Sequence, residues 1–255
     1  MIGKRNIKNI LRAFFQPRHY IALINMLRIY PRFSDNLWRY LTGRGHYPYD
    51  IQVRTPTGLV SIRLYSHHDL LTVNEIFCRN DYFADSSLRY AVDLGSNIGI
   101  SALYFLTRNK ESVCILYEPD PKNIEKLKQN LQGFEKRYTL FQAAVSDQAG
   151  QIEFGLEATG RYGGIGVKSE ESIMVRCVHI NEALENALRD SPFIDILKID
   201  TEGVEIKTLN AISTELLPYI STVYMEAQPS KDLHPGLFDN KQYGEVRKLS
   251  RKSKP

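Results

Sequence analysis

The stretch that decides the fold of this chain is YAVDLGSNIG, residues 90–99. Its first five residues form a short apolar run of the kind that a parallel sheet buries on both faces. The apolar spacing from Ile98 to Leu106 then predicts a helix. Gly95 and Gly99 allow a tight turn and the close approach of a ligand to the backbone, and N–H groups at a helix start attract an anionic group. We therefore expect a nucleotide-like ligand at this loop.

Downstream of this stretch, short apolar runs alternate with helical patterns. The expected strands are 90–94, 113–117, 139–144, 195–199 and 222–225, and the expected helices are 98–106, 121–131, 180–187 and 204–211. Strands and helices that alternate in this way form right-handed crossover units. The predicted fold class is therefore α/β, with a doubly wound, mostly parallel, Rossmann-like sheet.

Upstream, residues 1–87 are predicted as an N-terminal helical and β-hairpin extension packed on the core. Its short basic helices are broken at Pro17 and Pro31, because proline cannot continue a helix. Alternating residues on both sides of Thr55-Pro56-Thr57-Gly58 predict a hairpin, and Ser66 is a candidate cap for the helix after it.

Residues 88–228 are predicted as the ligand-binding domain, with a hairpin insertion at about 150–178. Strand patterns at 151–156 and 172–178 support the insertion. Residues 229–255 are polar and basic, and they are predicted as a tail. A pair of antiparallel strands that would close the sheet is not evident there, so either the inserted hairpin covers that edge or the sheet is short.

Composition and charge limit the function classes. The chain is 43% hydrophobic and 24% charged, which is typical of a folded globular protein. Its net charge is +4, and the first 45 residues hold nine basic residues against Asp35 alone. This end can attract anionic lipid, phosphate or an acidic partner, or it can be a solvated surface.

The three cysteines, Cys78, Cys114 and Cys177, show no metal-ligand or disulfide spacing, which favours a reducing compartment. The apolar run 21–27 is too short to span a membrane. We therefore expect a cytoplasmic protein, with membrane-surface contact through the basic N-terminus as an open alternative.

The glycine loop favours one class of cofactor over another. A dinucleotide fingerprint needs glycines where this chain has Asn97 and Ile100. The pattern D-x-G-x-N-x-G instead suits a cofactor with an amino-acid carboxylate and ammonium. The carboxylate would be bound by N–H groups of Gly95–Gly99, Ser96 included, and Asp93 would help to hold the ammonium.

The next strand ends in Tyr117-Glu118-Pro119, about twenty residues beyond Gly99. This is the separation of an acid that binds ribose hydroxyls, and Pro119 would hold the turn. The alternative role for Glu118 is to cap the helix that starts at Pro121. After the third strand, Ala144 leaves room for a flat ring such as adenine.

Candidate catalytic residues follow the fourth and fifth strands. Asp200 is the first choice as base or orienting group for the acceptor, with Glu202 and Glu226 on the same rim. The alternative for Asp200 and Glu202 is helix capping. His179 is a further candidate base or a structural histidine. No metal site is required by the spacing.

The glycine-rich loop 160–166 is predicted as a lid or as a plain hairpin tip. As a lid it would bring Arg161 and Tyr162 to the acceptor.

Taken together, residues 93–99, 117–119, 144–147 and 197–205 resemble the FkbM family of methyltransferases. The resemblance implies the class I methyltransferase fold, S-adenosylmethionine as methyl donor, S-adenosylhomocysteine as product, and O-methylation of a hydroxyl on a sugar, glycan or other natural product. It implies cofactor roles for Asp93, Gly95, Asn97, Gly99 and Glu118, and a role near the transferred methyl for Asp200 and Glu202.

Two alternatives stay open at this point. A nicotinamide-dependent oxidoreductase is disfavoured by Asn97 and Ile100, and a non-catalytic binding module with this fold would use the basic ends. The expected partner is a small-molecule or glycan acceptor, with a homodimer as a further option. No nucleic-acid partner is expected, because aromatic and basic residues are not interleaved as in known motifs.

Overall fold

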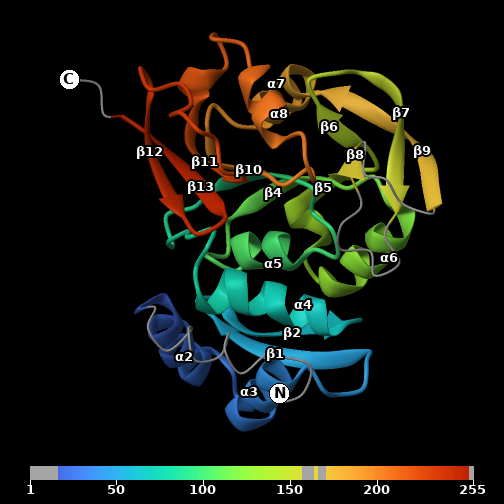
Figure 1. The fold of residues 1–255 in the computed structure, drawn as a ribbon, viewed down its shortest axis with the longest axis vertical. Helices are drawn as coiled ribbons and strands as arrows, with labels where there is room; N and C mark the ends of the chain where they lie inside the picture. The colour runs from blue at the N-terminus through green and yellow to red at the C-terminus, as the bar shows by residue number, and fades with distance from the viewer. Residues whose placement is uncertain (1–16, 157–163, 166–170, 253–255) are drawn as a thin grey trace. The chain divides into compact units, whose positions relative to one another are not determined.

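The structure is a computed structural model, and it describes residues 17–156, 164–165 and 171–252. Arg161 and Tyr162 lie outside the described residues. The chain divides into two units, Met1–Ser86 and Ser87–Pro255, here called the N-terminal and C-terminal units. Figure 1 labels their elements.

The described residues of the N-terminal unit form two helices, a hairpin and a further helix. Its elements are α2 (Pro17–Ile29), α3 (Phe33–Thr42), β1 (Tyr49–Thr55), β2 (Gly58–Leu64), α4 (His67–Val73) and the π-helical turn η1 (Asn74–Cys78). Strands β1 and β2 pair antiparallel, with Thr55 opposite Gly58. Ser66 caps α4, because its side chain accepts from the Asp69 N–H while the Asp69 carboxylate accepts from the Ser66 N–H.

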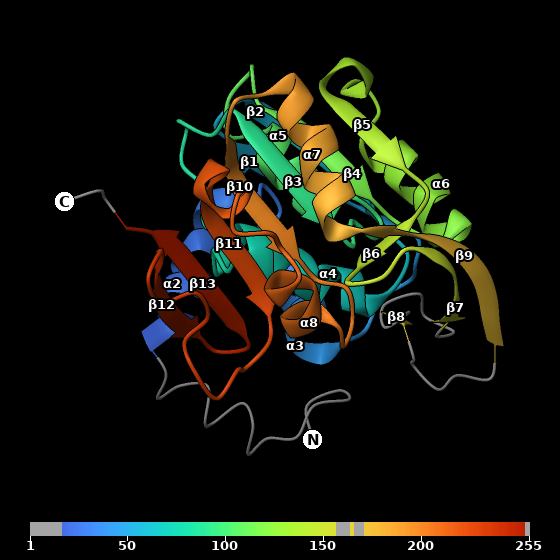
Figure 2. The same ribbon diagram turned by 90° about the horizontal axis from the view of Figure 1, so that it is seen from above.

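The described residues of the C-terminal unit form a seven-stranded sheet. Its strands are β3 (Tyr90–Leu94), β4 (Val113–Tyr117), β5 (Tyr138–Phe141), β10 (Ile194–Ile199), β11 (Ile220–Glu226), β12 (Phe238–Tyr243) and β13 (Val246–Arg251). They lie in the order β12-β13-β11-β10-β3-β4-β5, as Figure 2 shows. The first five in chain order are parallel, and the last two are antiparallel. The predicted α/β class with a mostly parallel sheet is confirmed.

Helices cover both faces of this sheet. Helices α5 (Ile100–Leu106) and α6 (Pro121–Asn130) lie on one face, and α7 (Ile180–Asp190) and α8 (Glu205–Asn210) on the other (Figure 1). The second face holds the main apolar cluster, which includes Val92, Leu197 and Val223 from the strands. Because strand side chains alternate between faces, Asp93 and Lys198 point away from that cluster. Two short 3-10 turns, η2 (Glu135–Arg137) and η3 (Leu217–Tyr219), precede β5 and β11.

The insertion forms a second, smaller sheet. Its strands are β6 (Ala144–Ser146), β7 (Gly150–Leu156), β8 (Gly164–Ile165) and β9 (Glu171–His179), in the order β6-β9-β7-β8. Strands β7 and β9 pair antiparallel along the expected hairpin, whereas β6 and β9 run parallel. The expected single strand 139–144 is wrong, since the chain leaves the large sheet after Phe141 and enters the small one at Ala144.

The predicted polar tail at 229–255 is also wrong for most of its length. Strands β12 and β13 pair with each other, and β13 pairs with β11, so the antiparallel pair that seemed missing closes the large sheet. The neighbouring buried residues Phe238, Val246 and Leu249 anchor it. The remaining positions are polar because they lie near a sheet edge, where one face meets water.

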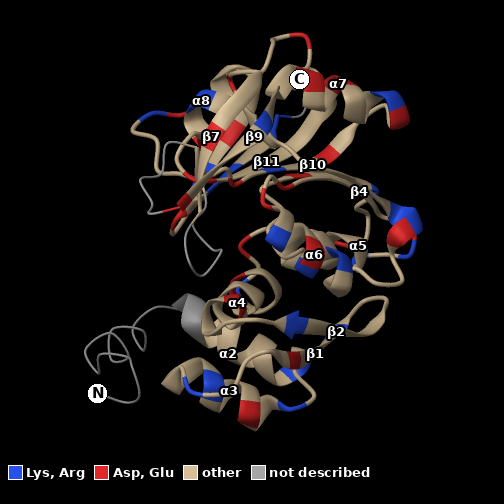
Figure 3. Ribbon diagram, turned by 90° about the vertical axis from the view of Figure 1, so that its right-hand side faces the viewer, with Lys and Arg blue, Asp and Glu red and all other residues tan. Residues whose placement is uncertain are grey.

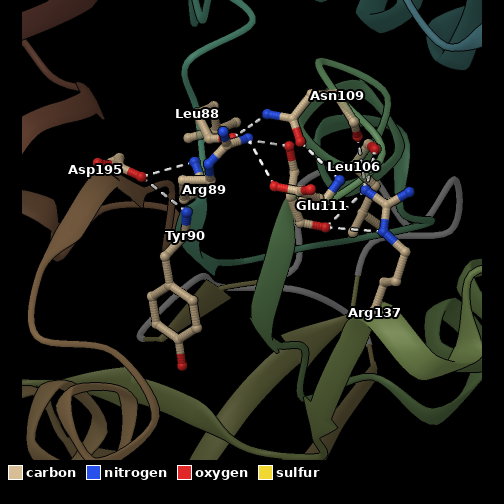
Figure 4. A network of polar contacts seen from close by, with 9 residues as sticks. Leu88, Arg89, Tyr90, Leu106, Asn109, Glu111, Arg137 and Asp195 are labelled. Atoms are coloured by element: carbon tan, nitrogen blue, oxygen red, sulfur yellow. Dashed lines mark hydrogen bonds and ion pairs between the residues drawn. The ribbon is translucent and has the colours of Figure 1, made fainter.

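Polar contacts close the end of the sheet where β3 and β4 begin (Figure 4). Asp195 Oδ2 accepts from the N–H groups of Arg89 and Tyr90, each at 2.8 Å. Arg137 donates to the carbonyls of Ser112, Asn109 and Leu106 at 2.7, 2.9 and 2.5 Å. One guanidinium thus satisfies three main-chain acceptors, which identifies Arg137 as a structural residue.

We expect Arg137→Ala to lower the free energy of unfolding by about 2–3 kcal/mol, because it leaves carbonyl groups without their donors. Urea denaturation followed by circular dichroism measures this loss. Arg189→Ala, which changes an exposed arginine on α7, is the control and should change stability little. Equal stability of the two variants would contradict the structural role of Arg137.

Candidate active site

The turn after β3 is held by a close contact with β10. Gly95 has φ +80°, and a Cβ there would lie 1.9 Å from the Asp200 carbonyl oxygen. The Asp200 N–H donates to the Leu94 carbonyl at 3.1 Å. No side chain fits at position 95, so the glycine allows the ends of β3 and β10 to meet. The missing side chain thus makes room for Asp200 rather than for a ligand.

The backbone N–H groups of residues 95–99 all donate within the protein. Their acceptors, in chain order, are the Tyr117 carbonyl for Gly95 and Ser96, Glu118 Oε2 for Asn97, Asn97 Oδ1 for Ile98 and the Ser96 carbonyl for Gly99. In this conformation these groups therefore have acceptors within the protein, and their contact with a carboxylate stays a prediction. Asn97 adopts φ 47°, a conformation that asparagine tolerates better than most residues.

Gly99 serves helix packing. It has φ +85°, and a Cβ there would lie 3.1 Å from Leu127 Cγ and 3.4 Å from Leu131 Cγ. Asn130 Nδ2 donates to the Ile98 carbonyl at 2.9 Å, which ties the end of α6 to the same loop. Helix α5 begins at Ile100, two residues later than expected, because the loop continues through Gly99. The Ser96 hydroxyl is buried and donates to the Asp93 carbonyl.

Glu118 lies at the end of β4 with a buried carboxylate. Its Oε2 accepts from the Asn97 N–H at 2.8 Å, and its Oε1 accepts from the Asp120 N–H at 2.9 Å and more weakly from Asn123 Nδ2 at 3.4 Å. Burial raises the pKa of Glu118 to about 7, although the two backbone hydrogen bonds oppose the rise. A carboxylate has about four acceptor positions, and three are used here, so Glu118 retains about one position for a hydroxyl donor.

The helix-capping alternative for Glu118 does not hold. The N-cap of α6 is Asp120, whose side chain accepts from the Lys122 N–H at 2.8 Å, with Pro121 as the first helical residue. Pro119 is buried between the two acids. Glu118 instead links the end of β4 to the glycine loop through the Asn97 N–H.

A buried lysine joins two acids beneath the loop. Lys198 Nζ lies 3.0 Å from Asp93 Oδ1 and 3.1 Å from Asp200 Oδ2, and it donates to the Gly95 carbonyl at 2.9 Å. Lys198 and Asp93 are paired in register on β10 and β3. The contact with Asp93 is an ion pair without hydrogen-bond geometry at Oδ1. Asp93 Oδ2 accepts from the Ser101 hydroxyl at 2.5 Å.

Burial disfavours the charged form of Lys198, but Asp200 and Asp93 outweigh it and raise the lysine pKa. Burial also raises the pKa of Asp93, and Lys198 and Ser101 oppose that rise. Asp93 was expected to hold an ammonium group of a ligand. In the structure the ammonium nearest to Asp93 is that of Lys198, and the aspartate is 0% exposed.

Two glutamates shape the loop after β10. Glu205 Oε1 accepts from the N–H groups of Thr201 and Gly203, at 3.1 and 2.9 Å, and so holds the turn. Glu202 has φ 54° and is half-buried. Burial, followed by repulsion from Asp200, Glu226 and Glu205, raises the pKa of Glu202 to about 8. Glu205 thus stabilises the turn. Asp200 and Glu202 make no side-chain cap at the start of α8, so they remain candidates for a catalytic role.

The structure brings together only some of the other candidates. Glu226 is exposed at the end of β11 and acts electrostatically on both Lys198 and Glu202, so it belongs to the same edge. His179 caps α7, and its Nδ1 accepts from the Asn181 N–H at 3.2 Å. This contact agrees with a structural role for His179, which was the alternative to a catalytic base. Ala144 is buried with Phe154 and Cys177 in the small sheet, and its expected adenine contact stays a prediction.

Among the described residues, no group of three or more His, Cys, Asp or Glu side chains is arranged to hold a metal ion. No helix within the described ranges is both long and apolar enough to cross a membrane.

Comparison with known proteins assigns the chain to a family. Residues 93–252 match the Methyltransferase FkbM domain, and the chain belongs to the FkbM methyltransferase family. The match begins at Asp93 and runs through β13, so it includes the whole edge described above.

Solved structures with similar folds are distant in sequence. The FkbM methyltransferase of Methylobacillus flagellatus KT is 14% identical, with 72% of this chain and 54% of that chain covered and a TM-score of 0.45. A methyltransferase of Geobacter sulfurreducens is 14% identical, with 71% and 79% covered and a TM-score of 0.41. An rRNA methylase of Streptococcus thermophilus is 10% identical, with 72% and 96% covered and a TM-score of 0.39. The chain thus spans about half the length of the Methylobacillus protein, and no curated protein matches it.

Lys198 and Glu205 are site residues that the sequence analysis did not identify. Lys198 had a visible signal, since it is a charged residue inside the expected strand 195–199, which was predicted to be buried on both faces. The signal for Glu205 was weaker, because it was only an acidic residue in the first turn of a predicted helix.

We expect Lys198→Met to lower the free energy of unfolding by about 3–5 kcal/mol near neutral pH, because it leaves buried Asp93 without its counterion. Loss of the lysine raises the folded-state pKa of Asp93 further. The folded protein then binds more protons than the unfolded chain, so the defect grows as pH rises through the aspartate range. Denaturation at acidic and neutral pH measures the difference.

Lys198→Met combined with Asp93→Asn is the matched control, because it removes both charges of the pair. It should recover part of the stability lost at neutral pH. A defect of equal size at both pH values would show that Lys198 contributes through packing alone.

Proposed function

We propose that the protein transfers the methyl group of S-adenosylmethionine to a hydroxyl of a sugar, glycan or other natural product. The single observation that carries the proposal is the buried Glu118 carboxylate at the end of β4, with about one acceptor position left after two backbone hydrogen bonds and a weaker one from Asn123. Ribose hydroxyls are donors of the kind that this carboxylate can bind.

The charge of the site fits this cofactor better than a dinucleotide. Asp200 and Glu226 both act on Glu202 at the ends of β10 and β11, and Lys198 is the cation that acts on Glu202 in turn. The N–H groups of residues 95–99 are already occupied by acceptors within the protein. An edge of this charge disfavours a pyrophosphate and favours a ligand that carries sulfonium and ammonium groups. Together with the family membership, this argues against the oxidoreductase alternative.

When bound, the cofactor supplies an electrophilic methyl carbon for in-line displacement. The protein's own part is to hold the acceptor oxygen in line and to receive its proton. Glu202 fits the role of proton acceptor, because its raised pKa lies near working pH and its side chain is partly accessible. Asp200, fixed by Lys198 at 3.1 Å, fits the role of orienting the acceptor.

We expect Glu118→Ala to weaken binding of both S-adenosylmethionine and S-adenosylhomocysteine by about 10- to 100-fold, which corresponds to the loss of one charge-assisted hydrogen bond. Isothermal titration calorimetry measures both affinities. Glu125→Ala, which alters an exposed glutamate on α6, is the control and should bind like the wild type. Unchanged affinity in Glu118→Ala, with circular dichroism showing a folded chain, would refute the assigned ribose contact.

We expect kcat/KM for a hydroxyl acceptor to rise with pH as Glu202 loses its proton. The apparent pKa should lie at or below about 8, because the sulfonium charge of the cofactor favours the carboxylate. Glu202→Gln should lower the rate by about 10²- to 10⁴-fold and abolish this pH dependence. Transfer of a labelled methyl group to a panel of hydroxylated glycans measures both.

Glu245→Gln, in the turn between β12 and β13, is the control and should keep the wild-type profile. If Glu202→Gln kept the pH dependence while Asp200→Asn lost it, the base would be Asp200. Cofactor binding without transfer to any hydroxyl would favour a non-catalytic binding module.

A further inference from the structure

One face of helix α2 contacts η1 of the N-terminal unit. Asn25 Nδ2 donates to the Cys78 carbonyl at 2.7 Å, and the hydroxyl of Tyr30, just beyond the helix, donates to Asn74 Oδ1 at 2.9 Å. Met26 is 2% exposed on the same face. These contacts fix the orientation of α2 against η1, so its opposite face is defined as well.

That opposite face is apolar. Five of its side chains form what we call the apolar stripe, and their exposed fractions are Tyr20 50%, Ile21 53%, Leu23 40%, Ile24 49% and Leu27 54%. Residues spaced by three, four and seven positions lie along one side of a helix. A surface helix of a globular domain normally carries polar residues on its outer side. The apolar stripe therefore fits a binding surface.

Positive charge borders the stripe. Arg28 and Arg32 are exposed at the C-terminal end of α2, and Arg54 Nη1 donates to the Arg28 carbonyl at 3.3 Å, which brings a third guanidinium to this end. Helix α2 contains no acidic residue (Figure 3). In the first 45 residues of the sequence Asp35 is the only acid. The chemistry next to the stripe is therefore suited to an anionic surface.

We propose that the apolar stripe of α2 binds the surface of an anionic membrane, lying in the plane of the interface. An amphipathic helix with aliphatic and aromatic residues on one side and arginines beside them binds lipid by apolar burial together with attraction to anionic headgroups. A second copy of the chain fits less well, because it would bring like charges together around the stripe. The proposal does not depend on methyl transfer.

The test is co-sedimentation of the full chain with vesicles of phosphatidylcholine alone and of phosphatidylcholine mixed with an equal amount of phosphatidylglycerol. The wild type should partition strongly to the anionic vesicles and less at high salt. The triple variant Ile21→Gln, Ile24→Gln, Leu27→Gln should lose about a hundredfold in partitioning, since three half-exposed apolar side chains are removed. Glutamine is a good helix former, so the helix should persist.

The matched control is Met174→Gln with Phe193→Gln, which removes exposed apolar surface from the C-terminal unit and should bind like the wild type. A second variant, Arg28→Gln with Arg32→Gln, should reduce the preference for anionic over neutral vesicles.

Three results would overturn the proposal. These are no partitioning of the wild type, equal partitioning of wild type and triple variant, or a wild-type dimer in analytical ultracentrifugation that the triple variant converts to a monomer without any vesicle binding. The last would assign the stripe to a second copy. The vesicle assay contains no cofactor and no acceptor, so a negative result in it does not contradict the methyltransferase proposal. The calorimetry with Glu118→Ala tests the methyltransferase proposal separately.

Discussion

The Lys198 ammonium between Asp93 and Asp200 is the interaction on which the site depends. It links β3 to β10 at the point where both strands end, and it also fixes the Gly95 carbonyl. A buried charge is costly unless it is paired, so each member of this group requires the others. The same contact determines where Asp200 can point. Fold stability and the geometry of the site are therefore maintained by one set of charges.

The charges above this group determine what the edge can bind. Lys198 is shared between two aspartates, and Asp200, Glu226 and Glu205 raise the pKa of Glu202 at the strand ends by repulsion. The loop that was expected to bind an anion donates its N–H groups inward instead. The region therefore attracts cationic groups, and Glu118 adds an acceptor for neutral hydroxyls. These properties follow from the arrangement of a few side chains, and the glycine pattern alone does not show them.

Much of the central sheet could be predicted from the sequence, because each parallel strand is a short apolar run followed by a distinct motif. Glu118 was found from its separation from the glycine loop, and the structure shows that Asp120 performs the capping role that was its alternative. The methyltransferase family was found from four motifs in order. Each of these features depends on residues close together in the chain, so it can be recognised from a single sequence.

The failures have a different physical origin. Strands β12 and β13 were missed because the segment is basic and few of its positions are apolar. The buried side chains of Phe238, Val246 and Leu249 are enough to hold a hairpin at the edge of the sheet. The break between β5 and β6 was missed because both halves have strand-like residues, and only pairing with different partners separates them. The inward hydrogen bonds of residues 95–97 depend on Tyr117 and Glu118, which are distant in sequence. Such facts arise from tertiary contacts.

The position of β13 has a consequence for synthesis of the chain. Strand β13 lies between β11 and β12, so the large sheet is complete only after residues through Arg251 have been made. A nascent chain that has reached Ala227 carries the apolar strand β11 with one edge unpaired. An open edge of this kind is a template for wrong pairing with other chains. Ribosome stalling within 228–246 would therefore yield a product prone to aggregation, although it already carries Asp93, Glu118 and Asp200.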